Sequence, residues 1–119
     1  KFLLKREKEQ AENYVKVWVN EIRRIKSADC IILFGSILKK QKKAKDIDVV
    51  FITNQKKFSQ LKKEIEEINE VNIKKIHPIY QTKEDAIKNI KKRDKIILNA
   101  IKGLTIYGED ILIKVIAVL

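Results

Sequence analysis

Residues 30–53, CIILFGSILKKQKKAKDIDVVFIT, decide the fold of this chain. The run 30–34 is almost entirely apolar, which is typical of a strand buried on both faces, and it ends at Gly35-Ser36. A connection made mainly of lysine residues follows over 39–45. A second apolar run closes the stretch. The pattern therefore predicts two buried strands joined by a polar connection.

The segments on either side of this stretch predict amphipathic helices. Apolar residues recur at three- and four-residue steps over 2–25 and again over 58–68. A third such pattern covers 87–101, behind a predicted capping box in which Thr82 is the cap and Asp85 reaches back to it. Each of these helices is expected to bury its apolar face against the two strands.

Two further strands and a closing helix complete the predicted fold. Residues 71–80 are strand-like, and Pro78 lacks the N–H that a central strand needs, which places this strand at a sheet edge. Gly103 is expected to end the third helix, before a short strand over 104–107 and a helix over 109–119. The sequence thus predicts an α/β (α+β) fold: a small mixed β-sheet flanked by helices.

The composition limits the classes of protein to which the chain can belong. Its 119 residues suit a single domain over 1–119, and 45% of them are hydrophobic, which favours a folded core. The lone Cys30 excludes an internal disulfide and suggests a reduced, cytoplasmic setting. No apolar run approaches the ~20 residues of a membrane span, so no membrane partner is expected.

The net charge of +11 favours a polyanionic partner such as a nucleotide, a nucleic acid or an acidic protein. The alternative is that the lysines, which are spread along every segment, only solvate the surfaces of helices.

Asp46 and Asp48 are the candidate metal ligands. Side chains alternate along a strand, so both should point the same way, about 6–7 Å apart, while Ile47 points into the core. Two such carboxylates are well placed to share Mg²⁺, which prefers oxygen ligands and can clamp a triphosphate. The alternative is a pair of solvated charges at the start of a strand.

The Gly35-Ser36 turn is the candidate phosphate-binding element. Without a Cβ, Gly35 lets phosphate oxygens approach the backbone closely. Ser36 is expected to cap a short helix that begins near Ile37, offering its hydroxyl and free amides to an anion. An ordinary strand-to-helix turn is the alternative for this dipeptide alone. Together with the two aspartates, it predicts a nucleoside triphosphate site that uses Mg²⁺.

Phe34-Gly35-Ser36 followed by Asp46-Ile47-Asp48 resembles the signature of the polymerase-beta-like nucleotidyltransferase superfamily, and specifically of its minimal members. The resemblance implies that the Gly-Ser turn contacts the triphosphate and that both aspartates bind divalent metal. It also implies the polymerase-beta-like nucleotidyltransferase fold.

The reaction implied by the resemblance is transfer of a nucleoside monophosphate, most often AMP from ATP, to a hydroxyl. Minimal members frequently pair with a helical HEPN toxin and act as its antitoxin by modifying it with AMP. Some archaeal members carry a winged-helix domain ahead of the transferase domain. Because the chain lacks an initial Met and opens on KFLLKREKEQ, we expect a fragment whose N-terminal region, such as a winged helix, is missing.

Two departures from the family pattern concern the predicted site. Lys45 stands where a serine commonly precedes the first aspartate, and with its neighbours it is expected to attract phosphates. Active members have a third carboxylate on a later strand, whereas 71–80 contains no Asp or Glu and only Glu70 lies at its edge. His77 is the candidate to replace it as a base near neutral pH, the alternative being a structural histidine.

Three functions follow from these observations. The first is a Mg²⁺-dependent nucleotidyltransferase with ATP as its nucleotide and a protein hydroxyl, such as that of a HEPN-type partner, as its acceptor. The second is a catalytically weak or inactive nucleotide-binding module of a DNA-binding regulator, which the absent third carboxylate favours. The third, transfer onto RNA, is supported by the positive charge alone.

Overall fold

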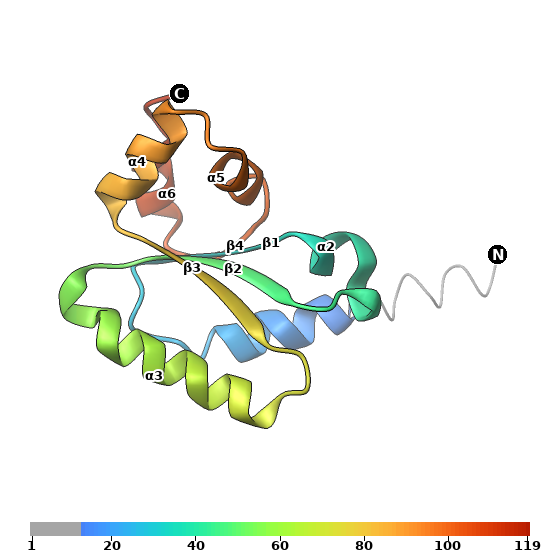
Figure 1. Cartoon of the computed structure of the whole chain (residues 1–119). Coiled ribbons are helices and arrows are strands. Elements are labelled where there is room, and N and C mark those ends of the chain that lie inside the picture. The colour runs from blue at the N-terminus through green and yellow to red at the C-terminus, as the bar shows by residue number, and fades with distance from the viewer. Residues whose placement is uncertain (1–12) are drawn as a thin grey trace.

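The computed structural model describes residues 13–119, which form a four-stranded mixed sheet with helices on both faces (Figure 1). The strand order is β3-β2-β1-β4. β1 is antiparallel to both β2 and β4, and β2 is parallel to β3. The strands are β1 (Cys30–Phe34), β2 (Ile47–Ile52), β3 (Ile76–Gln81) and β4 (Leu104–Tyr107). This architecture confirms the predicted α/β fold class.

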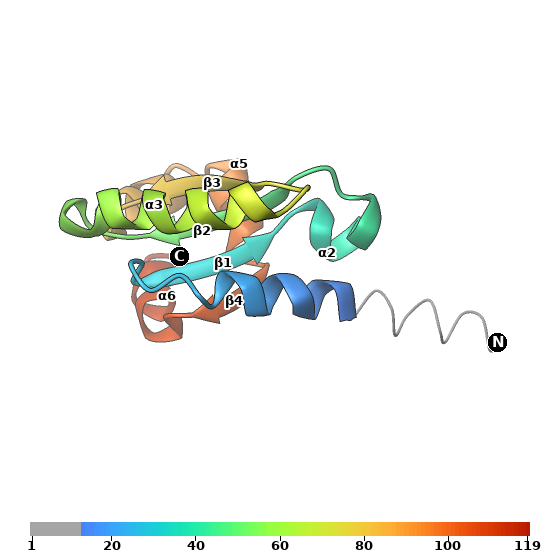
Figure 2. The ribbon, with the colours of Figure 1, turned by 90° about the horizontal axis from the view of Figure 1, so that it is seen from below.

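The helices divide into two layers (Figures 1 and 2). The N-terminal helix, whose described part is residues 13–22, and α3 (Gln55–Val71) lie side by side on one face of the sheet. The other face is covered by α4 (Lys83–Lys91), α5 (Lys95–Ala100) and α6 (Glu109–Ile116). Between β1 and β2 the chain forms α2 (Ser36–Lys40) and a single 3₁₀ turn (Gln41–Lys43).

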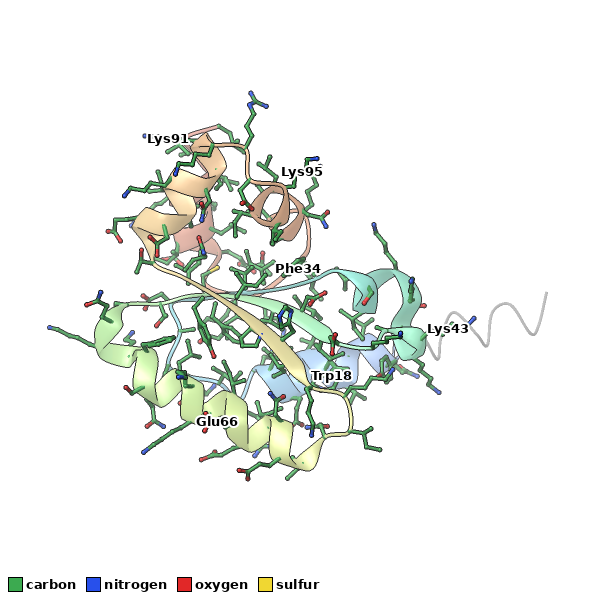
Figure 3. The ribbon with its side chains drawn as sticks, in the orientation of Figure 1. Trp18, Phe34, Lys43, Glu66, Lys91 and Lys95 are labelled. Atoms are coloured by element: carbon green, nitrogen blue, oxygen red, sulfur yellow. The ribbon has the colours of Figure 1, made fainter. Side chains whose placement is uncertain are left out.

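Two hydrophobic cores explain why β1 and β2 are apolar throughout. Alternate side chains of β1 enter opposite cores: Ile31 and Leu33 pack with Trp18 beneath the sheet, while Ile32 and Phe34 pack against the α4–α6 layer. Figure 3 shows Trp18 and Phe34 on opposite sides of the sheet. A strand covered on both faces excludes water from both, so both sets of side chains gain from being apolar.

The predicted third helix, 87–101, is interrupted in the structure. Arg93 adopts a left-handed conformation with φ of 58°, and the Asp94 carboxylate accepts a hydrogen bond of 3.0 Å from the N–H of Ile97, starting a new helix. Periodicity did not reveal the break, because apolar residues on both sides of it enter the same core. The predicted capping box between Thr82 and Asp85 is confirmed.

Other predicted boundaries also moved. The strand expected over 71–80 begins only at Ile76, since α3 continues to Val71, although its edge position is confirmed. The connection over 39–45 is partly helical. The helix predicted over 2–25 is helical over 13–22, and its first eleven residues lie outside the described part. Within the described residues, no helix combines the length and apolarity needed to cross a membrane.

Side chains from other elements hold the turn over 25–28, which leads from the N-terminal helix into β1. The Tyr107 hydroxyl on β4 donates a hydrogen bond of 2.7 Å to the carbonyl of Ala28. From α3, the Glu64 carboxylate accepts bonds of 3.0 Å from the N–H of Ser27 and 2.9 Å from its hydroxyl. The start of β1 is therefore anchored both to the neighbouring strand β4 and to helix α3.

Replacing Glu64 with Ala is expected to lower the free energy of unfolding by about 1–2 kcal/mol at pH 7, because several donors lose their acceptor. Partial burial raises the pKa of Glu64, but hydrogen bonds from the Lys26 backbone, from Ser27 and from Gln60 outweigh it and lower the pKa. Its stabilisation is therefore present above the unfolded-state pKa of about 4.3 and is lost as the pH falls through the lower folded-state pKa.

Urea denaturation between pH 7 and pH 3 checks this prediction, and the difference between wild type and Glu64→Ala should shrink as the solution is acidified. Glu66→Ala is the matched control, since Glu66 is exposed on the outer side of α3 (Figure 3). A loss of stability that stayed constant with pH would contradict a role for the ionised carboxylate.

Candidate functional site

The candidate site lies where β1 ends and where β2 and β3 begin. In the antiparallel pair Phe34 is opposite Asp48, and in the parallel pair Asp48 is opposite His77. The turn that follows Phe34, the second aspartate and the histidine thus come from three adjacent strands. Phe34 and His77 lie 43 positions apart in the chain, and the pairing of the strands brings their neighbourhoods to the same end of the sheet.

Gly35 packs directly against the Asp48 carboxylate. Its backbone has φ of 80° and ψ of −149°, a combination essentially restricted to glycine. A Cβ added to Gly35 would lie only 2.5 Å from Asp48 Oδ2. The glycine is therefore required twice, by the turn that ends β1 and by the carboxylate beside it.

Ser36 is the first residue of α2, and Gly35 is the N-cap. The expectation that the Ser36 side chain caps this helix is wrong, since no side-chain capping bond is present. The physical reason is that Gly35 makes the turn with its unusual backbone, so Ser36 already belongs to the helix. Ser36 is half-buried and adjoins the Gly35–Asp48 contact along the chain.

Asp48 and His77 form the closest polar contact of the site. His77 Nδ1 lies 3.1 Å from Asp48 Oδ1. The Asp48 side chain is 28% exposed, whereas that of His77 is 65% exposed and can be reached from solvent. The carboxylate is thus held between two neighbours, with Gly35 beside one oxygen and His77 beside the other.

Asp46 lies one residue before β2 and is exposed, and Lys45 before it is exposed as well. Ile47, between the two aspartates, is completely buried in the core beneath the sheet, as expected. Asp48 and Val50 are two residues apart in β2, so their side chains lie on the same face of the sheet. Val50 packs in the core on the α4–α6 side, and Asp48 therefore lies on that face as well.

A metal ion bound at this end of the sheet, beside Asp48, would have few protein ligands. Within residues 13–119, no group of three or more His, Cys, Asp and Glu side chains is arranged to hold a metal ion. Mg²⁺ needs no such cage, because it is commonly bound by one or two carboxylates together with substrate phosphates and water. Asp46, Asp48 and the space beside Gly35 therefore fit Mg²⁺ that arrives with a triphosphate.

Glu70 does not supply a third carboxylate. It belongs to α3 and lines a groove of about 410 Å³ between that helix and the turn after the N-terminal helix, together with Arg24 and Ile25. β3 itself, IHPIYQ, contains no acid, as the sequence indicates. Of the chain's residues with acid–base chemistry near neutral pH, His77 is the one that the structure brings to Asp48.

The lysine-rich connection forms one flank of the site. Its exposed members follow the Gly35-Ser36 turn through α2 and the 3₁₀ turn, and Lys43 projects from the edge of the molecule (Figure 3). Lys74 anchors this connection: its ammonium donates to the carbonyl of Lys42 and lies 5.2 Å from the centre of the Tyr14 ring. The exposed lysines are Lys39, Lys40, Lys42, Lys43 and Lys45.

Two supporting residues of the site were missed by sequence reasoning. No role was expected for Lys74, because its contacts with the lysine-rich connection and with Tyr14 join residues far apart in the chain. Gly103 was predicted to end a helix, but a Cβ there would also lie 2.4 Å from the Leu33 carbonyl and 2.8 Å from Phe34 Cβ. A glycine just before a strand was the sequence signal available for this close approach of the backbone to the end of β1.

One of three comparisons with known proteins found a match. A family model described as "Polymerase beta, Nucleotidyltransferase" matches residues 18–103. The matched region includes every residue of the candidate site. Comparisons with curated proteins and with solved structures found no match.

Proposed function

The chain belongs to the polymerase beta nucleotidyltransferase family, and from this premise we propose that it transfers AMP from ATP to a hydroxyl of a protein partner in a Mg²⁺-dependent reaction. Nucleotidyl transfer from a nucleoside triphosphate is the general activity of the family domain. The observation that carries the proposal is the contact between Gly35 and Asp48, which joins the phosphate-binding turn to a metal-binding carboxylate.

Each half of the site has a separate part in this proposal. Gly35 leaves the backbone open to phosphate oxygens, and the hydroxyl and N–H of Ser36 donate to them. Asp46 and Asp48 hold Mg²⁺, which supplies charge neutralisation for the triphosphate. Because Gly35 has no Cβ, the Asp48 carboxylate can lie against the turn, which keeps the proposed phosphate donors close to the proposed metal ligand.

The proposed transfer is a displacement at the α-phosphorus of ATP. The acceptor oxygen forms a bond to this phosphorus, the bond to the oxygen that bridges to the β-phosphate breaks, and pyrophosphate leaves. The acceptor hydroxyl loses its proton in the same reaction. His77 was expected from the sequence to take this proton, and its Nδ1 lies 3.1 Å from the Asp48 carboxylate.

The lysine-rich connection is proposed to attract ATP to the site. Lys39, Lys40, Lys42, Lys43 and Lys45 are exposed and follow directly on the phosphate-binding turn. Exposed charges act over about 10 Å at 0.1 M salt, so this contribution should affect the rate of association and weaken as salt is added.

A HEPN-type helical protein is the proposed acceptor, which would make the chain a cytoplasmic antitoxin. The support for this partner is the resemblance of the Gly-Ser and Asp-Ile-Asp motifs to minimal nucleotidyltransferases. A second candidate is a nucleotide-binding regulatory module without turnover. It is favoured because, within the described residues, no three His, Cys, Asp or Glu side chains are grouped so that they could hold a metal ion.

Labelled ATP distinguishes the two candidates. The full chain is incubated with Mg²⁺, with a HEPN-type helical protein as candidate acceptor and with ATP labelled at either the α- or the γ-phosphate. AMP transfer predicts that the α-label, but not the γ-label, becomes bound to the partner, and that Asp48→Asn abolishes the signal. ATP binding without any transferred label would support the regulatory module, and absence of both would contradict the two candidates together.

A further inference from the structure

The chain is poor in ligands for transition metals. It contains one His, one Cys and no Met. Cys30 is fully buried within β1, and burial, together with the charges of Asp110, Glu109 and Asp29, raises the pKa of its thiol to about 11. A thiol buried within β1 has no access to a metal ion from solvent. Imidazole ligation of a metal by this protein can come only from His77.

His77 lies at a ligand-like distance from a carboxylate oxygen. The parallel register of β2 and β3 places it opposite Asp48, with Nδ1 and Oδ1 3.1 Å apart. Two neighbouring ligands at about 2.1 Å from an octahedral ion lie about 3.0 Å from each other. The two atoms thus already have the separation that one shared metal ion would require.

The orientation of this pair is restricted on the side of the carboxylate. Asp48 Oδ2 lies 2.5 Å from the position that a Cβ on residue 35 would occupy, and Oδ1 lies beside the imidazole. The carboxylate is therefore placed between Gly35 and His77. The His77 ring is 65% exposed, which gives an ion access from solvent without unfolding either strand. The phosphates of a bound nucleotide and water are available as further oxygen ligands.

We infer that His77 Nδ1 binds the catalytic metal together with Asp48, and that the site consequently prefers borderline ions such as Co²⁺ and Zn²⁺ over Mg²⁺. This inference rests on the proposed function, in which Asp48 binds the metal. Imidazole is a good ligand for transition ions, whereas Mg²⁺ prefers oxygen. A neutral imidazole also adds no negative charge, so it contributes less to binding of Mg²⁺ than a carboxylate at the same place would.

The competing explanation is a simple hydrogen bond in which Nδ1–H donates to Asp48 and Nε2 serves as a base. The two explanations differ in which nitrogen changes when metal is added. Ligation uses the lone pair of Nδ1, so the single proton of the neutral ring must then be on Nε2, whereas in the base role Nδ1 keeps the proton and neither nitrogen binds the ion. The single histidine makes this difference measurable without assignment of other rings.

The test follows the imidazole ¹⁵N resonances of the full chain during titration with Zn²⁺ and, separately, with Mg²⁺. The expected result is a saturable shift of Nδ1 with Zn²⁺ at one equivalent and a much smaller one with Mg²⁺. Calorimetry with Co²⁺ and Mg²⁺ on wild type, His77→Asp and His77→Asn provides the second measurement. His77→Asp is expected to reduce the preference for Co²⁺ over Mg²⁺ at least tenfold by restoring an oxygen ligand.

His77→Asn separates loss of the ligand from loss of the fold, since the ring is exposed and circular dichroism should remain unchanged. An unshifted Nδ1, a shift confined to Nε2, or an unchanged Co²⁺/Mg²⁺ ratio in His77→Asp would overturn the inference. If Mg²⁺ and ATP still bind in an Asp48-dependent manner, the proposed function survives that failure. If Asp48→Asn leaves the binding of metal and ATP unchanged, the proposed function fails as well.

Discussion

Replacing both Asp46 and Asp48 with Asn should abolish measurable Mg²⁺-dependent binding of ATP, and Asp48→Asn alone should weaken it about a hundredfold or more. Loss of an outer partner of a metal ligand already costs 10–100-fold in metal affinity, and loss of the ligand itself exceeds that. Asn preserves the shape that packs against Gly35, so the change removes charge while the close contact remains.

Asp48 is expected to matter more than Asp46 because its position is better restrained. Its carboxylate is held between Gly35 and His77, whereas Asp46 is exposed before the strand begins. A restrained ligand loses less conformational entropy on binding. The effect of Asp46→Asn alone should accordingly be smaller than that of Asp48→Asn.

Isothermal calorimetry with ATP in the presence and absence of Mg²⁺ measures these effects. Asp110→Asn is the control of equal charge change, since Asp110 is exposed in the first turn of α6, on an element that contributes nothing to the site. It should bind ATP like wild type. Unchanged affinity in the double variant would contradict both the metal site and the function built on it.

Gly35→Ala is the substitution expected to affect stability and binding together. The φ of 80° with ψ of −149° is unfavourable for alanine by about 1–3 kcal/mol. The new Cβ must also displace the Asp48 carboxylate, whose Oδ2 lies 2.5 Å from the position it would occupy. We expect a loss of about 2–4 kcal/mol in the free energy of unfolding, and a loss of ATP affinity in the fraction that remains folded.

A double-mutant cycle separates the two causes. In an Asp48→Ala background the carboxylate is gone, so Gly35→Ala should cost less by about 1–2 kcal/mol, with the remainder due to backbone strain. Urea denaturation of the four proteins gives the coupling energy. Equal costs in both backgrounds would mean that the carboxylate moves aside freely, and a cost near zero would show that the turn tolerates alanine.

Several elements could be predicted from local pattern because local physics determines them. The apolar runs that became β1 and β2 predict strands buried on both faces, and the helices over them follow from three- and four-residue periodicity. The capping box before α4 is confirmed for the same reason, since its hydrogen bonds join residues three apart. The fold class followed from these patterns, whereas the family was indicated by the resemblance of the Gly-Ser and Asp-Ile-Asp motifs to a known signature and is shown by the family-model match.

The local sequence pattern was misleading where two backbone conformations are compatible with the same arrangement of residues. The break between α4 and α5 was missed because Ile90 and Ile97 enter the same core on either side of it. Ser36 was assigned the capping role by its residue type, although the backbone of Gly35 had already made the turn. In each case a single backbone angle decided the outcome, and residue composition specifies such an angle only weakly.

Residue types and motifs are enough to say which residues are available for chemistry: a glycine-serine turn, two aspartates, one histidine and a run of lysines. Which of these residues meet depends on how the strands pair. Asp48 contacts Gly35 and His77 because β1, β2 and β3 pair in one particular register, and a shift by one residue would turn Asp48 into the core. That register depends on burying apolar side chains on both faces of the sheet at once, which is a property of the whole packed chain.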